Sequence, residues 1–143
     1  MQRESALLLI AASMLVASCT GGEAVGPPTT IVTGAVTRQG MPVSDAIVSF
    51  EPVDEQGQHA QAFTDDDGRF DVSIYVNNKT IKRGMAPGHY RVTVRQVESP
   101  SGKSTLSPPK NLLPEKYASP ATSELEATID LQNPTELTFE IDG

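Results

Sequence analysis

The chain has 143 residues and a formal net charge of −7, with 18 Asp and Glu against 11 Lys and Arg. This length suits one domain rather than two, and the acidic balance disfavours nucleic acid as a partner, because phosphate binding needs a basic surface. Trp is absent, and the 11 Pro and 11 Gly fall mostly between apolar segments, which is typical of many short elements joined by turns.

The first 18 residues have the layout of an export signal peptide. Arg3 precedes an apolar run, ALLLIAASMLV at residues 6–16, and small residues follow it. A charged start, an apolar middle and a small-residue end are the marks of such a signal. The run is shorter than the roughly 20 apolar residues that a membrane-spanning helix needs. We therefore expect residues 1–18 to direct export.

Cys19 ends the sequence LVASC and is the only cysteine of the chain. A lone cysteine cannot form an internal disulfide, so an exported protein needs another reason to carry it. LVASC resembles the lipobox of bacterial lipoproteins, which implies cleavage just before Cys19, a diacylglycerol on its thiol and an acylated amino group. Two or more acyl chains hold a protein on a membrane where one does not. The alternative is a free thiol in an ordinary signal peptide.

The membrane is therefore the expected partner of a lipidated Cys19. The following residue is Thr20, not the aspartate that marks inner-membrane retention in some bacterial lipoproteins, so we expect the outer membrane. The stretch TGGEAVGPPTT then discourages helix and strand alike. We predict that residues 19–30 are a flexible tether, whose 11 residues after Cys19 span at most about 35 Å, and that residues 31–143 are the folded domain.

From residue 31 onward the apolar positions alternate with a period of two, which indicates strands with one buried face. The alternation predicts seven strands: residues 31–38, 46–52, 58–64, 69–76, 89–97, 124–131 and 136–142. No segment beyond the signal shows a helical period. Strands of this kind pack as two sheets face to face or close into a barrel, so the expected fold is all-β.

The sequence FTDDDGRF, residues 63–70, places three adjacent carboxylates and a glycine between apolar residues. Asp tolerates turn positions and Gly supplies the positive φ of a tight hairpin, so a turn is the favoured interpretation. Calcium wants six to eight oxygen ligands, and three adjacent aspartates on an extended chain cannot all point at one ion. Asp65, Asp66 and Asp67 are therefore only weak candidates for metal ligands, and no cofactor is expected.

Several motifs occur in the order typical of exported bacterial proteins with a carboxypeptidase regulatory-like, or transthyretin-like, domain. They are VTGAVTRQGMPVSDAIVSFEP, TDDDGRFDVSI, GMAPGHYRVTV and LLPEKYASPATSELEATI. The chain resembles this family from residue 31 to residue 142. The resemblance implies a seven-stranded Greek-key β-sandwich, and it is informative about fold rather than activity, because one fold hosts many functions.

The transthyretin-like fold includes a urate-pathway hydrolase, which makes the two histidines, His59 and His89, candidate catalytic groups. That hydrolase family ends in Tyr-Arg-Gly-Ser, whereas this chain ends in EIDG. Strand alternation also sends Tyr90 and Arg91 to opposite faces. No nucleophile–base pattern, phosphate-binding loop or zinc spacing is visible. We therefore predict no catalytic residues and keep a small transthyretin-type hydrolase as the alternative.

Two further segments are candidate contact regions. KTIKR, residues 79–83, is the one basic cluster; we interpret it as a solvated loop, with a patch for an acidic glycan or partner as the alternative. Residues 98–123 form a long proline-containing loop of a kind that is often functional, and we expect Leu112, Leu113 and Tyr117 to hold it on the sandwich. The sequence thus predicts a non-catalytic, lipid-anchored envelope module that binds an envelope protein or a glycan, or acts structurally; carbohydrate binding is a further alternative, which the lack of Trp disfavours.

Overall fold

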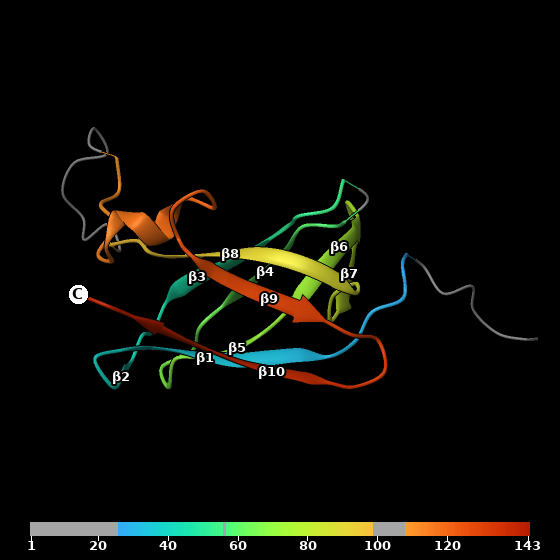
Figure 1. Ribbon diagram of the computed structural model, residues 1–143, viewed down its shortest axis with the longest axis horizontal. Coiled ribbons are helices and arrows are strands. Elements are labelled where there is room, and N and C mark those ends of the chain that lie inside the picture. The colour runs from blue at the N-terminus through green and yellow to red at the C-terminus, as the bar shows by residue number, and fades with distance from the viewer. Residues whose placement is uncertain (1–25, 56, 99–107) are drawn as a thin grey trace, which may run out of the picture.

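The computed structural model describes residues 26–55, 57–98 and 108–143, so residues 1–18, Cys19 and most of the predicted tether lie outside the described residues. The described part contains ten strands and one short 3₁₀ helix (Figure 1). The strands are β1 Val32–Arg38, β2 Met41–Pro42, β3 Ala46–Pro52, β4 Ala60–Phe63, β5 Arg69–Asp71, β6 Ser73–Asn77, β7 Thr80–Arg83, β8 Gly88–Gln96, β9 Leu125–Ile129 and β10 Thr135–Ile141; the helix is η1 Glu115–Ala118.

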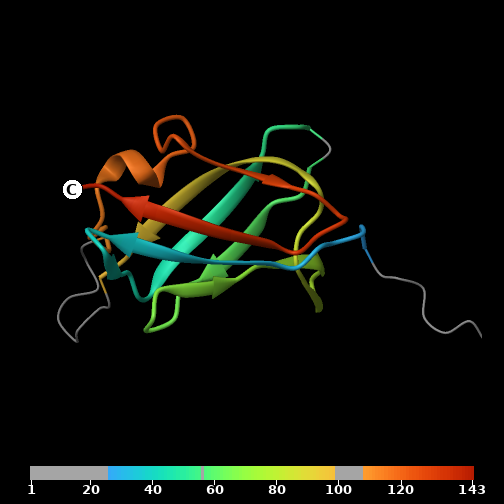
Figure 2. The same cartoon turned by 60° about the horizontal axis from the view of Figure 1, so that its bottom comes forward.

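The strands form two sheets. The smaller has the order β10-β1-β2, with β5 also paired to β1, and the larger has the order β7-β6-β4-β3-β8-β9. Figures 1 and 2 show the two sheets as separate layers. The neighbours in the larger sheet are antiparallel, whereas β1 and β10 run parallel, from Val32 opposite Thr135 to Arg38 opposite Ile141. The expected all-β sandwich is confirmed.

The core lies between the sheets and is centred on the ring of Phe50, which is fully buried. Its centroid is 6.2 Å from Phe70 and 6.4 Å from Phe139, both of the smaller sheet, and 6.5 Å from Tyr90 of its own sheet. Phe70 and Phe139 stack with 7° between their planes. These aromatic contacts join the layers, because each ring contributes a large apolar area at preferred offset or edge geometries.

The prediction of seven strands was wrong, because ten strands occur in the described residues. The predicted strand at residues 69–76 is two strands that belong to different sheets. At Val72 the chain passes between them: its amide donates to the Val32 carbonyl at 2.9 Å, and its carbonyl accepts from the Gly84 amide at 2.7 Å. The side chain of Val72 stays buried, so the alternation continues through the change of sheet and conceals it. Greek-key connectivity stays a prediction.

The remaining differences are local. The two-residue strand β2 is too short to show a period, and β7 occupies the segment KTIKR that was interpreted as a loop. The strand predicted at residues 124–131 is shorter than expected, because β9 ends at Ile129, and the Leu131 side chain is 43% exposed. The 3₁₀ helix η1 follows Pro114 within the long loop, where no helix was expected.

The folded part begins before the predicted boundary at residue 31. The backbone of Thr30 pairs with Met85 through two 3.0 Å hydrogen bonds, and the Thr29 hydroxyl donates to the Arg83 carbonyl at 3.2 Å. The Lys82 ammonium donates to the Pro27 carbonyl at 2.8 Å. Residues 26–30, assigned to the tether from the sequence, therefore lie against β7 and the residues that follow it.

Candidate functional site

The three aspartates of the DDDG segment form a turn, as expected. One carboxylate oxygen of Asp65 accepts hydrogen bonds from the backbone amides of Asp67 and Arg69, both at 2.9 Å. The Gly68 amide donates to the Asp65 carbonyl at 2.9 Å, and Gly68 has a φ of +71°. This turn differs from the expected hairpin because β4 and β5, on either side of it, belong to different sheets.

Within the described ranges, no group of three or more His, Cys, Asp and Glu side chains is placed to hold a metal ion. The Asp65 oxygen is engaged in shaping the turn. The function that the geometry supports for Asp65 is therefore local: its side chain satisfies two backbone donors where the chain crosses between the sheets.

His89 lies in a cleft of about 570 Å³ at the start of β8, together with Asp54, Glu55 and Tyr90. Its Nδ1 is 3.1 Å from the hydroxyl of Thr128, on the neighbouring strand β9. The Tyr90 hydroxyl donates to the Ala86 carbonyl at 2.8 Å. Burial raises the pKa of Tyr90, and the charge of Asp54 raises it further, so this phenol stays a protonated donor at neutral pH.

His59 lines a different cleft, of about 300 Å³, with Glu51, Gln61 and the exposed ring of Tyr75. The structure therefore does not bring the two histidines into one site. The expected separation of Tyr90 and Arg91 is confirmed, because Tyr90 is 1% exposed in the core and Arg91 points to solvent.

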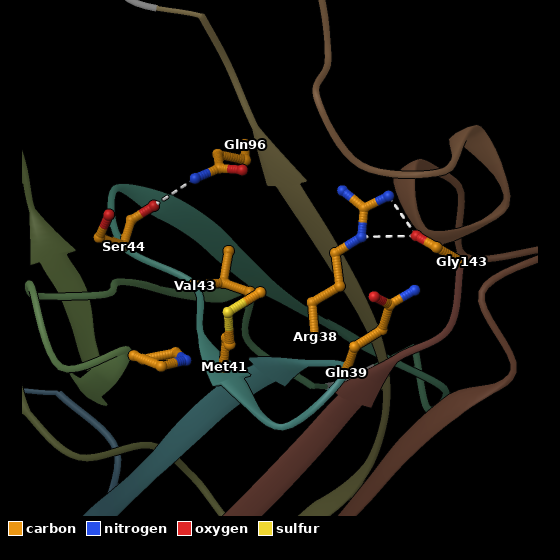
Figure 3. A pocket seen from close by; sticks show the side chains of 8 residues that line it. Arg38, Gln39, Met41, Val43, Ser44, Gln96 and Gly143 are labelled. Carbon is orange, nitrogen blue, oxygen red and sulfur yellow. Dashed lines mark hydrogen bonds between the residues drawn. The ribbon is translucent and has the colours of Figure 1, made fainter.

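A third cleft, of about 300 Å³, lies beside Arg38 at the end of β1 (Figure 3). The Arg38 guanidinium donates from Nε to the Gly143 carbonyl at 2.6 Å, from Nη2 to the same oxygen, and from Nη1 to the Leu112 carbonyl at 3.2 Å. The Gln96 amide donates to the Ser44 carbonyl at 2.8 Å. Both polar side chains thus bind the protein's own backbone. Sequence reasoning gave no signal for this role of Arg38.

Of the long loop at residues 98–123, the structure describes Glu98 and residues 108–123. As expected, Leu113 and Tyr117 attach it to the sandwich, with exposed fractions of 4% and 3%. The Tyr117 hydroxyl also accepts from the Asp142 amide at 3.1 Å. The expectation for Leu112 was wrong, because its side chain is 45% exposed while its carbonyl accepts from Arg38.

The basic segment KTIKR lies on the hairpin of β6 and β7 rather than in a free loop. Ile81 stands directly opposite Tyr75 across the two strands, and their side chains are 61% and 67% exposed. Arg83 forms an ion pair with Asp71, with 2.7 Å between Nε and the carboxylate, and this contact raises the pKa of Arg83. We name Tyr75, Lys79 and Ile81 the hairpin patch. Lys82 stands opposite the buried Ile74, on the other face of β7, and donates to the Pro27 carbonyl.

Comparisons with known proteins leave the family open. No protein-family model and no curated protein matches the chain. Among solved structures, a DUF3823 family protein from Parabacteroides merdae is similar, with 14% sequence identity and a TM-score of 0.41 over 80% of this chain. The match spans 46% of that protein's own chain. Across the parts of the chain that the structure describes, no helix has the length and apolar character to span a bilayer.

Proposed function

We propose that this protein is a non-catalytic, lipid-anchored β-sandwich module of the cell envelope, with a binding or structural role. The observation that carries the proposal is the sequence LVASC, which places the chain's only cysteine directly after an apolar leader. Gly26, the first described residue, follows Cys19 by seven positions. An acylated Cys19 would therefore hold the sandwich close to the membrane, facing the periplasm or the cell surface.

We further propose that the sandwich is of the carboxypeptidase regulatory-like, transthyretin-like type. Support comes from two of the motifs that carry the resemblance. The DDDGRF segment forms one of the turns by which the chain passes between the two sheets. The GHYRVTV segment forms most of β8, a nine-residue strand between β3 and β9 that contributes Tyr90, Val92 and Val94 to the core.

Replacing Cys19 by alanine is expected to abolish lipid attachment. The full chain, produced in a bacterial host fed with alkyne-labelled palmitate, should be labelled and should sediment with membranes. The Cys19→Ala variant lacks the thiol that accepts the diacylglycerol, so its label should be lost completely. Ser18→Ala is the matched control, because it changes the neighbouring residue while keeping a small side chain and the thiol. A mature wild-type chain with an unmodified Cys19, identified by mass spectrometry, would contradict the proposal.

The hydrolase alternative has less support, because His59 and His89 line separate clefts and the hydrogen-bond partner of the His89 ring is the Thr128 hydroxyl. A histidine and a hydroxyl act together as base and nucleophile when a third group orients the histidine, and among the described residues Thr128 is the side-chain partner that the structure gives His89. We therefore rank a binding or structural role above hydrolysis.

Carbohydrate binding is a second candidate, favoured by the cleft in which the exposed Tyr75 ring lies beside His59 and Gln61. An aromatic face with a few polar neighbours is the kind of surface that binds a small polar ligand. The test is to apply the described domain to a glycan array. A binding signal that is lost in Tyr75→Ala and unchanged in Phe63→Ala would rank carbohydrate binding above the other candidates. Phe63 is a suitable control because its ring is similarly exposed, at 65%.

A further inference from the structure

The N-terminal segment runs along β7 toward the turn of the β6–β7 hairpin. Followed backward from Thr30, its contacts move from Met85 to Arg83 and then to Lys82. At Gly26 an added Cβ would meet a side-chain methyl of Val76, near the end of β6, at 2.6 Å. Figure 1 shows this segment entering at the end of the sandwich that holds β6 and β7, whereas the C-terminal end of β10 lies at the opposite end.

The direction of this segment decides which surface an anchor at Cys19 would hold near the membrane. Cys19 precedes Gly26 by seven residues, which can span at most about 25 Å even when fully extended. The sandwich end that carries the hairpin patch is therefore the end within reach of the bilayer, and the end at Gly143 is directed away from it.

The hairpin patch has the chemistry of a membrane-interface contact. Tyr75 and Ile81 present a cross-strand pair of exposed apolar side chains, and Tyr is enriched where proteins meet the headgroup region. Lys79 adds an exposed positive charge in the turn of the hairpin. Lys82 adds a second on the other face of β7, where its ammonium donates to the Pro27 carbonyl. Residues 72–89 contain three cations and no Asp or Glu. Juxtamembrane Lys and Arg are attracted to anionic lipid headgroups.

The charges around the patch limit its extent. Arg83 is paired with Asp71, and Glu51 lines the same cleft as Tyr75, so the positive charge of the hairpin comes from Lys79 and the half-buried Lys82. Asp54 and Glu55 lie in the loop between β3 and β4, and Gln58 of that loop donates to the Tyr75 carbonyl at 3.0 Å. Because the whole chain carries −7, attraction to an anionic surface has to be local, and it is confined to the hairpin.

We propose that the hairpin patch lies on the anionic bilayer surface and fixes the orientation of the anchored sandwich. This inference rests on the proposed attachment at Cys19. A short tether turns the contact into an intramolecular event with a high effective concentration, so a small contact made by Lys79 and two apolar side chains can orient the domain. The small sheet's outer face and the Arg38 end then point away from the lipid.

The test uses the chain from Cys19 onward with Tyr75→Trp as the only tryptophan. Its Cys19 thiol is coupled to a maleimide lipid in vesicles of phosphatidylcholine and phosphatidylglycerol in equal parts, or of phosphatidylcholine alone, with brominated acyl chains as the quencher. Chemical coupling bypasses cellular lipidation, so failure here is distinct from failure of palmitate labelling. Ile81→Trp in the wild-type Tyr75 background is the second reporter, in case the first variant does not fold.

We expect tryptophan quenching and a shift to shorter wavelength on the anionic vesicles. Lys79→Glu should weaken the contact by more than the roughly five-fold expected from loss of one cation, because it adds a repelling charge. Lys110→Glu, the same change on an exposed residue before η1, should leave the quenching unchanged. Three results would overturn the proposal: an unquenched tryptophan, equal quenching on both kinds of vesicle, or equal effects of the two charge reversals. If the tryptophan is unquenched, the patch is free to bind a glycan or a protein partner instead.

Discussion

Replacing Phe50 by alanine is expected to lower the free energy of unfolding by about 3–5 kcal/mol, the usual cost of deleting a buried aromatic side chain. The Phe50 ring is fully buried and contacts three other aromatic rings: Phe70 and Phe139 across the core and Tyr90 beside it. Its loss leaves a cavity between the layers, and rigid strands on both sides restrict the collapse that would fill it.

Urea unfolding of the described domain measures this effect. Phe63→Ala is the matched control, because it deletes the same atoms from a side chain that is 65% exposed, and it should change the free energy of unfolding by no more than about 0.5 kcal/mol. Similar losses for the two variants would contradict the placement of the core around Phe50.

The second large effect is expected from Gly84→Ala, which should lower the free energy of unfolding by roughly 2–5 kcal/mol through backbone strain and overpacking together. Gly84 has a φ of +90°, a conformation that L side chains rarely adopt. An added Cβ would also collide with the Thr30 carbonyl oxygen and lie 2.8 Å from the carbonyl carbon. The substitution therefore pushes the N-terminal segment away from β7 and its continuation.

Gly40→Ala separates the two causes. Gly40 has a similar φ of +78°, but an added Cβ there meets nothing within 4 Å, so this variant should lose only the strain, about 1–2 kcal/mol. Hydrogen exchange gives an independent measurement: the Thr30 and Met85 amides, which bond each other's carbonyls, should exchange faster in Gly84→Ala and not in Gly40→Ala. Unchanged protection of both amides in Gly84→Ala would contradict the docking of residues 26–30.

Most of the sheet structure could be predicted because each buried strand face imposes a period of two on the sequence. The predicted strand at residues 46–52 coincides with β3, and the inward positions Phe70, Val72 and Ile74 are buried. The same rule could not reveal the change of sheet at Val72, because a side chain that faces the interior from either layer is apolar in the same way.

The candidate contact surface was harder to predict for a different reason. KTIKR has three basic residues in five, so its composition resembled a solvated loop, yet the pairing of Ile81 with Tyr75 makes it an edge strand. Edge strands commonly carry Lys, and that signal was available in the sequence. The docking of residues 26–30 could not be predicted from the sequence, because it depends on a long-range contact between Thr30 and Met85. The Gly and Pro residues of this segment favour no regular structure.

The parallel pairing of β1 and β10 has a mechanical consequence. The chain enters β1 at one end of the sandwich and leaves β10 at the other (Figure 2). A force applied between the start of β1 and the end of β10 therefore pulls the two strands along their length in opposite directions. Seven successive residue pairs, from Val32 and Thr135 to Arg38 and Ile141, would share that shear load at the same moment, whereas a hairpin pulled from its open end yields one pair after another.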